Sequence, residues 1–151
     1  PTGALEKPRT LNANLCISYL TIESQNLPPP PLIEKIGDWF FGCDLCQTVC
    51  PWNQKIWQNS NIQIEKPFNE KNRLQWISEL QEILTLSGKQ LTRKFENTAL
   101  NRARPFGLRR NAIVVAMNQN LIELREVIEK YVTDPKLGPL ASQALDKLKI
   151  N

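Results

Sequence analysis

Thiol side chains gather in one short part of this 151-residue sequence, and thiolates are the ligands that soft metals and iron–sulfur clusters prefer. Three of the four cysteines, Cys43, Cys46 and Cys50, follow the spacing C-x2-C-x3-C and precede a proline. That spacing ends the bacterial pattern C-x2-C-x2-C-x3-C-P, in which the last cysteine binds a different cluster from the others. Phe40 stands where the first cysteine of the pattern belongs, and the remaining cysteine is Cys16. The motif therefore predicts ligands for iron–sulfur clusters.

The number of thiols predicts how the ligands are shared. If Cys50 binds a second cluster, Cys16 is available to join Cys43 and Cys46 on the first. One ligand of that first cluster is then missing. The chain begins with Pro-Thr-Gly-Ala-Leu, a sequence that commonly follows the last cysteine of a ferredoxin motif. We therefore expect a cysteine directly before Pro1, at the end of a first motif.

Other readings of the cysteines stay open. Four thiolates also suit a structural zinc ion, although a cysteine followed by proline at the x3 spacing is typical of ferredoxins. A disulfide scaffold is disfavoured, because the chain is long and shows no extracellular sign. The sequence has no histidine, which excludes histidine ligands and histidine-based acid–base catalysis within this chain.

The segment from position 89 to 110 is the most basic part of the chain. It has seven Lys and Arg residues against Glu96 alone, a charge of +6, whereas the whole chain carries +4. Such clustering is expected for a phosphate-rich partner. The alternative is a solvated helix face, or arginines paired with acids of neighbouring helices such as Glu123 and Glu126. The candidate phosphate contacts are Lys89, Arg93, Lys94, Arg102, Arg104, Arg109 and Arg110.

Aromatic side chains flank the cysteine motif. Trp39, Phe40 and Phe41 precede it, and Trp52 and Trp57 follow it. Burial and hydrogen bonding tune the potential of a cluster, so we expect these rings to shield it first and to stack on bases second.

The elements that must position these groups are mainly helical. Prolines divide the first third into short helices at 15–23, 32–40 and 44–49, with an extended polyproline connector at 28–31. From about 72 apolar residues recur at helical spacing, including Leu74, Ile77, Leu80, Ile83 and Leu84, and a stop follows at Ser87. Further helices are expected at 89–97, 105–117, 121–132 and 137–150, and strand signals are nearly absent.

The predicted fold class is therefore mainly α: a loop-rich segment like a bacterial ferredoxin, followed by antiparallel helices with HEAT-like repeat packing. We expect a ferredoxin-like segment at 1–70 and a helical domain at 71–151. No stretch approaches the roughly 18 apolar residues of a membrane span. The chain begins with proline, and its only methionine is Met117, so we expect a piece of a longer polypeptide.

The combination of motifs resembles the C-terminal part of the epoxyqueuosine reductase family. The resemblance extends over nearly the whole chain and is most specific at the cysteines. In that family a distant cysteine replaces the first cysteine of the motif, so Phe40 fits the pattern. The segments that carry the resemblance are Pro-Thr-Gly-Ala-Leu at 1–5, Cys-Ile-Ser-Tyr-Leu-Thr-Ile-Glu at 16–23, Gly-Cys-Asp-Leu-Cys-Gln-Thr-Val-Cys-Pro-Trp-Asn at 42–53, and Arg-Pro-Phe-Gly-Leu-Arg-Arg-Asn-Ala at 104–112.

The resemblance implies a cobalamin-binding catalytic domain outside this chain, two [4Fe-4S] clusters and a helical-repeat region that holds tRNA. Electrons would pass through the clusters to cobalamin, and epoxyqueuosine at the tRNA wobble position would be reduced to queuosine. Cys16, Cys43 and Cys46 would ligate one cluster with the cysteine before Pro1, and Cys50 would ligate the other.

The resemblance also implies a cytoplasmic monomer that contacts the anticodon stem-loop, with an unidentified electron donor. We expect no catalytic residue in this chain and no turnover by the chain alone. The alternatives are a ferredoxin-like electron-transfer module for a protein partner, a related corrinoid reductase such as a reductive dehalogenase, and a helical interaction domain without clusters.

Overall fold

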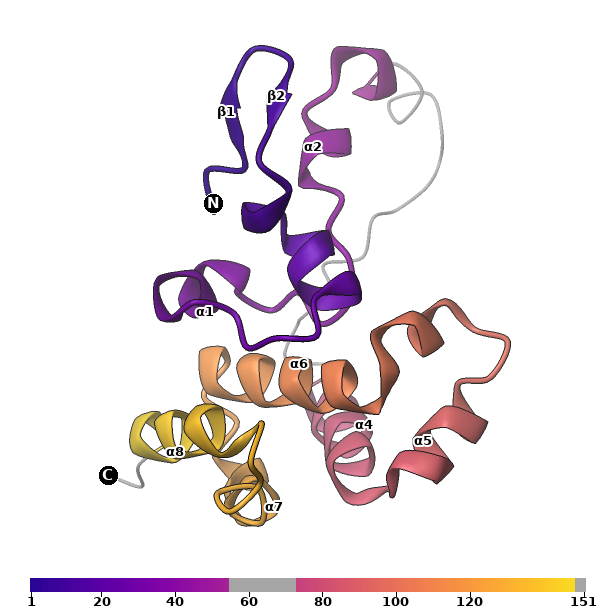
Figure 1. Cartoon of the computed structure of the whole chain (residues 1–151), viewed down its shortest axis with the longest axis vertical. Coiled ribbons are helices and arrows are strands. Elements are labelled where there is room, and N and C mark those ends of the chain that lie inside the picture. The colour runs from indigo at the N-terminus through magenta and orange to yellow at the C-terminus, as the bar shows by residue number, and fades with distance from the viewer. Residues whose placement is uncertain (55–72, 149–151) are drawn as a thin grey trace.

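Helices dominate the residues that the computed structural model describes, 1–54 and 73–148 (Figure 1). This confirms the mainly α expectation. We call residues 1–54 the cluster segment and residues 73–148 the helical segment. The predicted domain boundary at 70/71, Trp57 and the predicted helix end at Ile150 all lie outside the described residues.

The cluster segment begins with a β-hairpin that the sequence pattern did not predict. Strand β1 (Leu5–Lys7) pairs antiparallel with β2 (Thr10–Leu11), and Leu5 lies opposite Leu11. The turn includes Arg9 at a φ of 62°. The strands are short, and every strand residue is exposed, so the alternation of buried and exposed side chains that identifies a strand is absent.

The predicted helix at 15–23 is present in two pieces. A 3-10 turn, η1 (Ala13–Leu15), is capped by the side chain of Asn12. A π-helical turn, η2 (Tyr19–Glu23), follows, and its width shows in the bond from the Ser24 N–H to the Tyr19 carbonyl. Cys16 lies between the two turns.

The proline run is not a purely extended connector, which corrects the prediction. Helix α1 (Pro30–Ile36) begins inside the run, because the first turn of a helix leaves its N–H groups unpaired and therefore tolerates proline. The helix ends before Gly37, whose φ of 64° an L side chain rarely adopts, so the predicted extension to Phe40 is wrong. Helix α2 (Leu45–Thr48) lies within the predicted 44–49.

The helical segment contains the predicted helices with altered ends. Ser87 and Gln90 form a reciprocal capping box at the start of α5. Leu74, predicted to face inward, is 80% exposed. The elements are α4 (Arg73–Thr85), α5 (Gly88–Lys94), η4 (Ala99–Ala103), α6 (Arg104–Asn118), η5 (Ile122–Leu124), α7 (Arg125–Glu129) and α8 (Gly138–Lys147).

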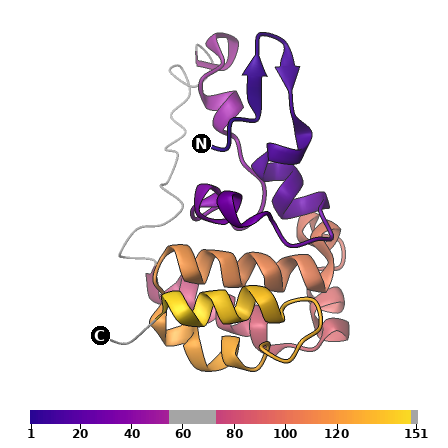
Figure 2. The same cartoon turned by 60° about the vertical axis from the view of Figure 1, so that its left-hand side comes forward.

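Helix α6 lies at the centre of the molecule. It contacts α1 and η2 of the cluster segment and α4, α5 and α8 of the helical segment. Figure 2 shows α6 and α8 side by side below the cluster segment. One hydrophobic core includes Ile17 and Ile33 from the cluster segment together with Leu108 and Ile113 of α6. The cluster segment is therefore packed directly onto α6.

In the part of the chain that is described, no helix has the length and apolar character needed to cross a membrane.

Candidate iron–sulfur site

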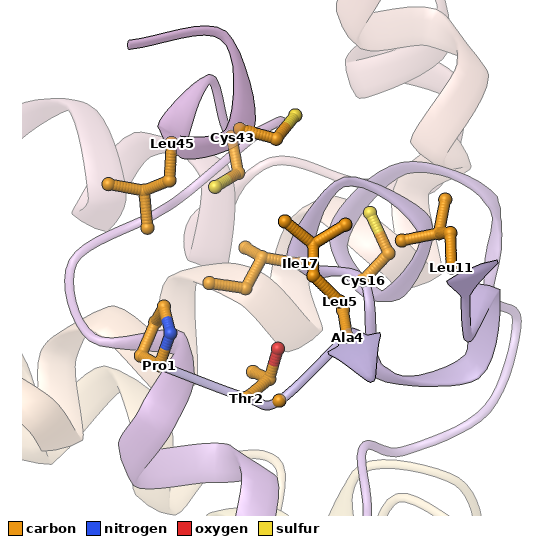
Figure 3. A pocket seen from close by; sticks show the side chains of 11 residues that line it. Pro1, Thr2, Ala4, Leu5, Leu11, Cys16, Ile17, Cys43 and Leu45 are labelled. Carbon is orange, nitrogen blue, oxygen red and sulfur yellow. The ribbon is translucent and has the colours of Figure 1, made fainter. Parts of the chain in front are cut away.

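Three of the four predicted cysteine ligands line one cavity of about 370 Å3. Cys16, Cys43 and Cys46 contribute to its wall, and Cys50 does not. Figure 3 shows Cys16 and Cys43 coming from different parts of the chain, with Pro1 and Thr2 along one side. The rest of the lining is largely aliphatic: residues 3–5, Leu11, Ile17 and Leu45. The structure thus brings together the three thiols that the ligand count assigned to one cluster.

Hydrogen bonds connect the helical residues that follow Cys16 to the loop that carries Cys43. The Gly42 N–H donates to the Thr21 hydroxyl over 3.0 Å, and the Ser18 hydroxyl donates to the Cys43 carbonyl over 3.1 Å. Gly42 itself has a φ of 79°, which glycine adopts at little cost. The loop therefore reverses at Gly42 and places Cys43 beside the helix that follows Cys16.

The chemistry of the donors fits an iron–sulfur cluster. All four cysteines are free thiols, and burial raises the pKa of Cys43, as do the neighbouring Cys16 and Cys46. Within residues 1–54 and 73–148, no three His, Cys, Asp or Glu side chains converge closely enough to hold a single metal ion. The three thiols instead surround a space. Soft ligands around an aliphatic cavity suit a cluster better than one zinc ion.

Cys50 lies beyond α2, apart from the cavity and beside apolar side chains that face solvent. Val49 is exposed, and Trp52 is 81% exposed and does not line the cavity, so Trp52 does not shield this cavity. Trp39, Phe40 and Phe41 pack against the hydrophobic core and are not among the residues that line the cavity. Its shell is therefore aliphatic, because the hairpin and the residues around Pro1 cover it.

The basic segment divides into three groups. Arg110 is 1% exposed and donates to the carbonyls of Ser24 at 2.5 Å and Asn26 at 2.9 Å, so its predicted contact with tRNA is wrong. Burial lowers its pKa to about 10, which leaves it protonated at neutral pH. Arg109 is half-buried, donates to the Leu86 carbonyl at 2.6 Å and lies over the Tyr131 ring.

The second group forms surface ion pairs: Lys94 with Glu82, and Arg102 with Glu23. The pairing acid expected for the basic segment, Glu123, instead binds Arg73 at 3.1 Å. The third group is Lys89, Arg93 and Arg104, which are exposed and form no ion pair with the described residues.

Two asparagines of α6 bind the cluster segment, and neither was predicted as a site residue. Asn111 donates to the carbonyls of Thr21 at 2.7 Å and Phe40 at 2.8 Å. Asn118 donates to the carbonyls of Ile33 at 2.7 Å and Gly37 at 2.9 Å. The available signal was an amide next to the apolar run at 112–117, since a polar residue buried in a helix needs partners from elsewhere.

Comparison with known proteins identifies related sequences and structures. Residues 1–53 match the 4Fe-4S double cluster binding domain family. The epoxyqueuosine reductase of Escherichia coli (strain K12) is 36% identical over 118 residues, which are 78% of this chain and 30% of that protein. That of Atelocyanobacterium thalassa is 38% identical over 115 residues, 74% of this chain and 36% of that protein.

Solved structures agree with the sequence matches. A crystal structure of epoxyqueuosine reductase with an epoxyqueuosine-modified stem loop of tyrosine tRNA has a TM-score of 0.75 and 28% identity, and the match covers 98% of this chain and 39% of that one. The enzyme from Streptococcus thermophilus gives a TM-score of 0.72 at 27% identity, over 100% and 40% of the chains. This chain spans about a third of the length of the curated relatives it matches. Over about three quarters of its length the chain is therefore similar to part of the epoxyqueuosine reductases, and its residues 1–53 match the double cluster family.

Proposed function

We propose that this chain is the iron–sulfur electron-relay and tRNA-binding part of an epoxyqueuosine reductase. The observation that carries the proposal is the cavity in which thiols from two separate segments, at Cys16 and at Cys43 and Cys46, meet within the region that matches the double cluster family. These three residues hold one [4Fe-4S] cluster, and Cys50 is a ligand of the other.

The first cluster needs one ligand more than these three thiols, and we propose that a part of the longer protein supplies it at the wall of the cavity that Pro1 lines. The clusters, when bound, carry single electrons. In the longer protein the clusters would pass these electrons to cobalamin in another domain, where epoxyqueuosine in tRNA would be reduced to queuosine. The residues of this chain position the clusters and exclude water, and the chain alone does not turn over the substrate.

Paired substitutions in the longer protein test the assignment of ligands. Two clusters contain about eight irons, and removing ligands of one cluster leaves about four. We expect Cys16→Ser combined with Cys43→Ser to lose no more iron than Cys43→Ser alone, because both residues hold the same cluster. Cys43→Ser combined with Cys50→Ser should lose iron from both. Iron and acid-labile sulfide analysis measures this, and iron-free wild-type protein would contradict the proposed function.

The tRNA surface that we propose is centred on the exposed basic residues Lys89, Arg93 and Arg104. A Cβ placed on Gly88 would lie 3.8 Å from the Cβ of Pro105, which places Lys89 and Arg104 on neighbouring parts of the surface. Lys94 and Arg102 lie on the same stretch and contribute only where tRNA phosphate replaces their glutamates. This surface accounts for binding to the anticodon stem-loop without Arg110.

Salt-dependent binding tests this surface. Replacing Lys89, Arg93 and Arg104 by Gln should weaken tRNA binding and reduce the slope of log K against log salt by about 0.7 to 0.9 for each lost phosphate contact. The control replaces Lys7, Lys35 and Lys130, three exposed lysines elsewhere, and changes the net charge by the same amount. Equal effects of the two triple variants would show that only net charge matters.

The helical segment also supports HEAT-like packing as part of the proposal. Helices α6 and α8 lie side by side, and the shorter α7 connects them (Figures 1 and 2). We also propose that the protein acts in the cytoplasm, where its tRNA partner is, and that it is a monomer.

A further inference from the structure

The side chain of Asn111 has all of its hydrogen-bonding capacity in use inside the protein. It is 3% exposed. Its amide nitrogen donates to the carbonyls of Thr21 and Phe40, and its amide oxygen accepts from Nε of Arg110 at 3.0 Å and from Nη2 at 2.9 Å. A guanidinium only donates, so these two bonds fix which end of the amide faces the carbonyls. Arg110 therefore orients Asn111.

The two carbonyls that Asn111 binds belong to the two segments that carry cysteines of the cavity. Thr21 lies in the helix that follows Cys16, and Phe40 lies in the loop that leads to Cys43. The Thr21 hydroxyl also accepts the Gly42 N–H, and it donates to the Ile17 carbonyl at 2.8 Å. One amide from α6 thus joins both ligand-bearing segments at a point where they already contact each other.

We propose that Asn111 is a positioning residue that sets the separation of Cys16 from Cys43 and so controls how firmly the cluster is held. This inference rests on the proposed function, because it needs a cluster at the cavity. Asn111 lies on α6, whose first turn carries Arg104. The helical segment therefore determines the geometry of a site to which it contributes no ligand.

Asn118 provides a matched control on the same helix. Its amide also donates twice to main-chain carbonyls of the cluster segment, but those carbonyls belong to Ile33 and Gly37, at and just after α1. Neither belongs to the segment that carries Cys16, and Gly37 only begins the loop that reaches Cys43 six positions later, so Asn118 does not join the two ligand-bearing segments. Asn118→Leu therefore removes the same number of bonds between α6 and the cluster segment and leaves the link between the two ligand-bearing segments intact, whereas Asn111→Leu also removes the two bonds from Arg110.

The experiment compares Asn111→Leu and Asn118→Leu in the full-length protein loaded with clusters. Because Asn111→Leu leaves the Thr21 and Phe40 carbonyls without this donor, we expect it to release iron to a chelator about tenfold faster than wild type, a difference of about 1.4 kcal/mol. Asn118→Leu should stay within about twofold. The reduction potential and the electron paramagnetic resonance signal of one cluster should change only in the Asn111 variant, while the signal of the cluster held by Cys50 stays constant.

Equal iron release by the two asparagine variants would overturn the proposal, because both changes would then act only through general stability. Thr21→Val supplies an independent test, since it removes the hydroxyl that accepts from Gly42 and leaves Asn111 in place. This variant should also release iron faster than wild type. Iron release at the wild-type rate would contradict the proposal that these hydrogen bonds between the Cys16 and Cys43 segments hold the cluster, even if Asn111→Leu fails to fold. Wild-type protein without iron refutes the proposed function, whereas two intact clusters with equal iron release refute only the role of Asn111.

Discussion

Replacing Arg110 by Met tests whether a buried charge that has no carboxylate partner among residues 1–54 and 73–148 stabilises this fold. The guanidinium forms four hydrogen bonds to three oxygens, those of Ser24, Asn26 and the Asn111 side chain. Methionine keeps most of the apolar volume but donates nothing. The Ser24 and Asn111 oxygens are then buried without a donor, whereas Asn26 is exposed, and water can bind its carbonyl.

The opposing terms can be compared in free energy of unfolding. Two unpaired buried acceptors cost about 2 kcal/mol each, and the smaller side chain leaves a void worth about 1 kcal/mol. Against this, burial lowers the pKa of Arg110 to about 10, which corresponds to roughly 3 kcal/mol of burial cost that methionine does not incur. The loss of hydrogen bonds and packing therefore outweighs the burial cost that is removed, and we expect Arg110→Met to destabilise the metal-free chain by about 2 kcal/mol.

Urea denaturation followed by circular dichroism measures this difference. With a slope of about 2 kcal/mol per molar, the midpoint should fall by about 1 M. Arg93→Met is the control, because Arg93 is exposed and forms no ion pair with the described residues, and its effect should stay within about 0.5 kcal/mol. An Arg110→Met variant as stable as wild type, or more stable, would show that the cost of burying the charge exceeds the value of its bonds and would refute the reasoning.

Three further outcomes are expected. In the metal-free chain, the reaction of Cys43 with iodoacetamide should reach half its maximal rate at a pH above the ordinary thiol pKa of about 8.5, because burial raises the pKa of Cys43 and keeps the thiol protonated. Peptide mass spectrometry of samples labelled at a series of pH values measures this, and half-maximal reactivity at or below about pH 8.5 would contradict it. Gly138→Ala should cost about 1–3 kcal/mol, because its Cβ would lie 2.6 Å from the Val132 carbonyl oxygen, whereas Gly88→Ala makes only an ordinary 3.8 Å contact and serves as the control in urea denaturation. Ser87→Ala should cost about 1 kcal/mol in the same assay by removing the cap of α5, and no change would mean that the capping box contributes nothing.

Local sequence signals predicted the helices and the grouping of the thiols. The stop at Ser87 is a capping box, and the count of ligands placed Cys16 with Cys43 although 26 positions separate them. The capping box depends on residues within one helical turn, and the grouping of the thiols depends on the number of ligands that a cluster requires. They do not require knowledge of how distant segments pack.

The features that the sequence did not predict depend on contacts between distant segments of the chain. Arg110 looked like a surface charge because its partners, the carbonyls of Ser24 and Asn26, are main-chain groups that no residue pattern reveals. The aliphatic shell of the cavity was missed for a similar reason, since the hairpin that supplies Leu5 and Leu11 has exposed strands without alternation. The exposure of Trp52 likewise depends on which elements pack beside it.

The wide turn at 19–23 constrains the length of the chain as well as its composition. A π-helical turn holds one residue more than an α-helical turn, and such turns are frequent at functional sites. Deleting that residue would rotate Cys16 by about 100° around the helix axis relative to Ser24, since an α-helix has 3.6 residues per turn. The number of residues between Cys16 and the end of η2 is therefore as restricted as the identity of the cysteine. Single-residue deletions and insertions here should be tolerated far less well than substitutions at its exposed positions.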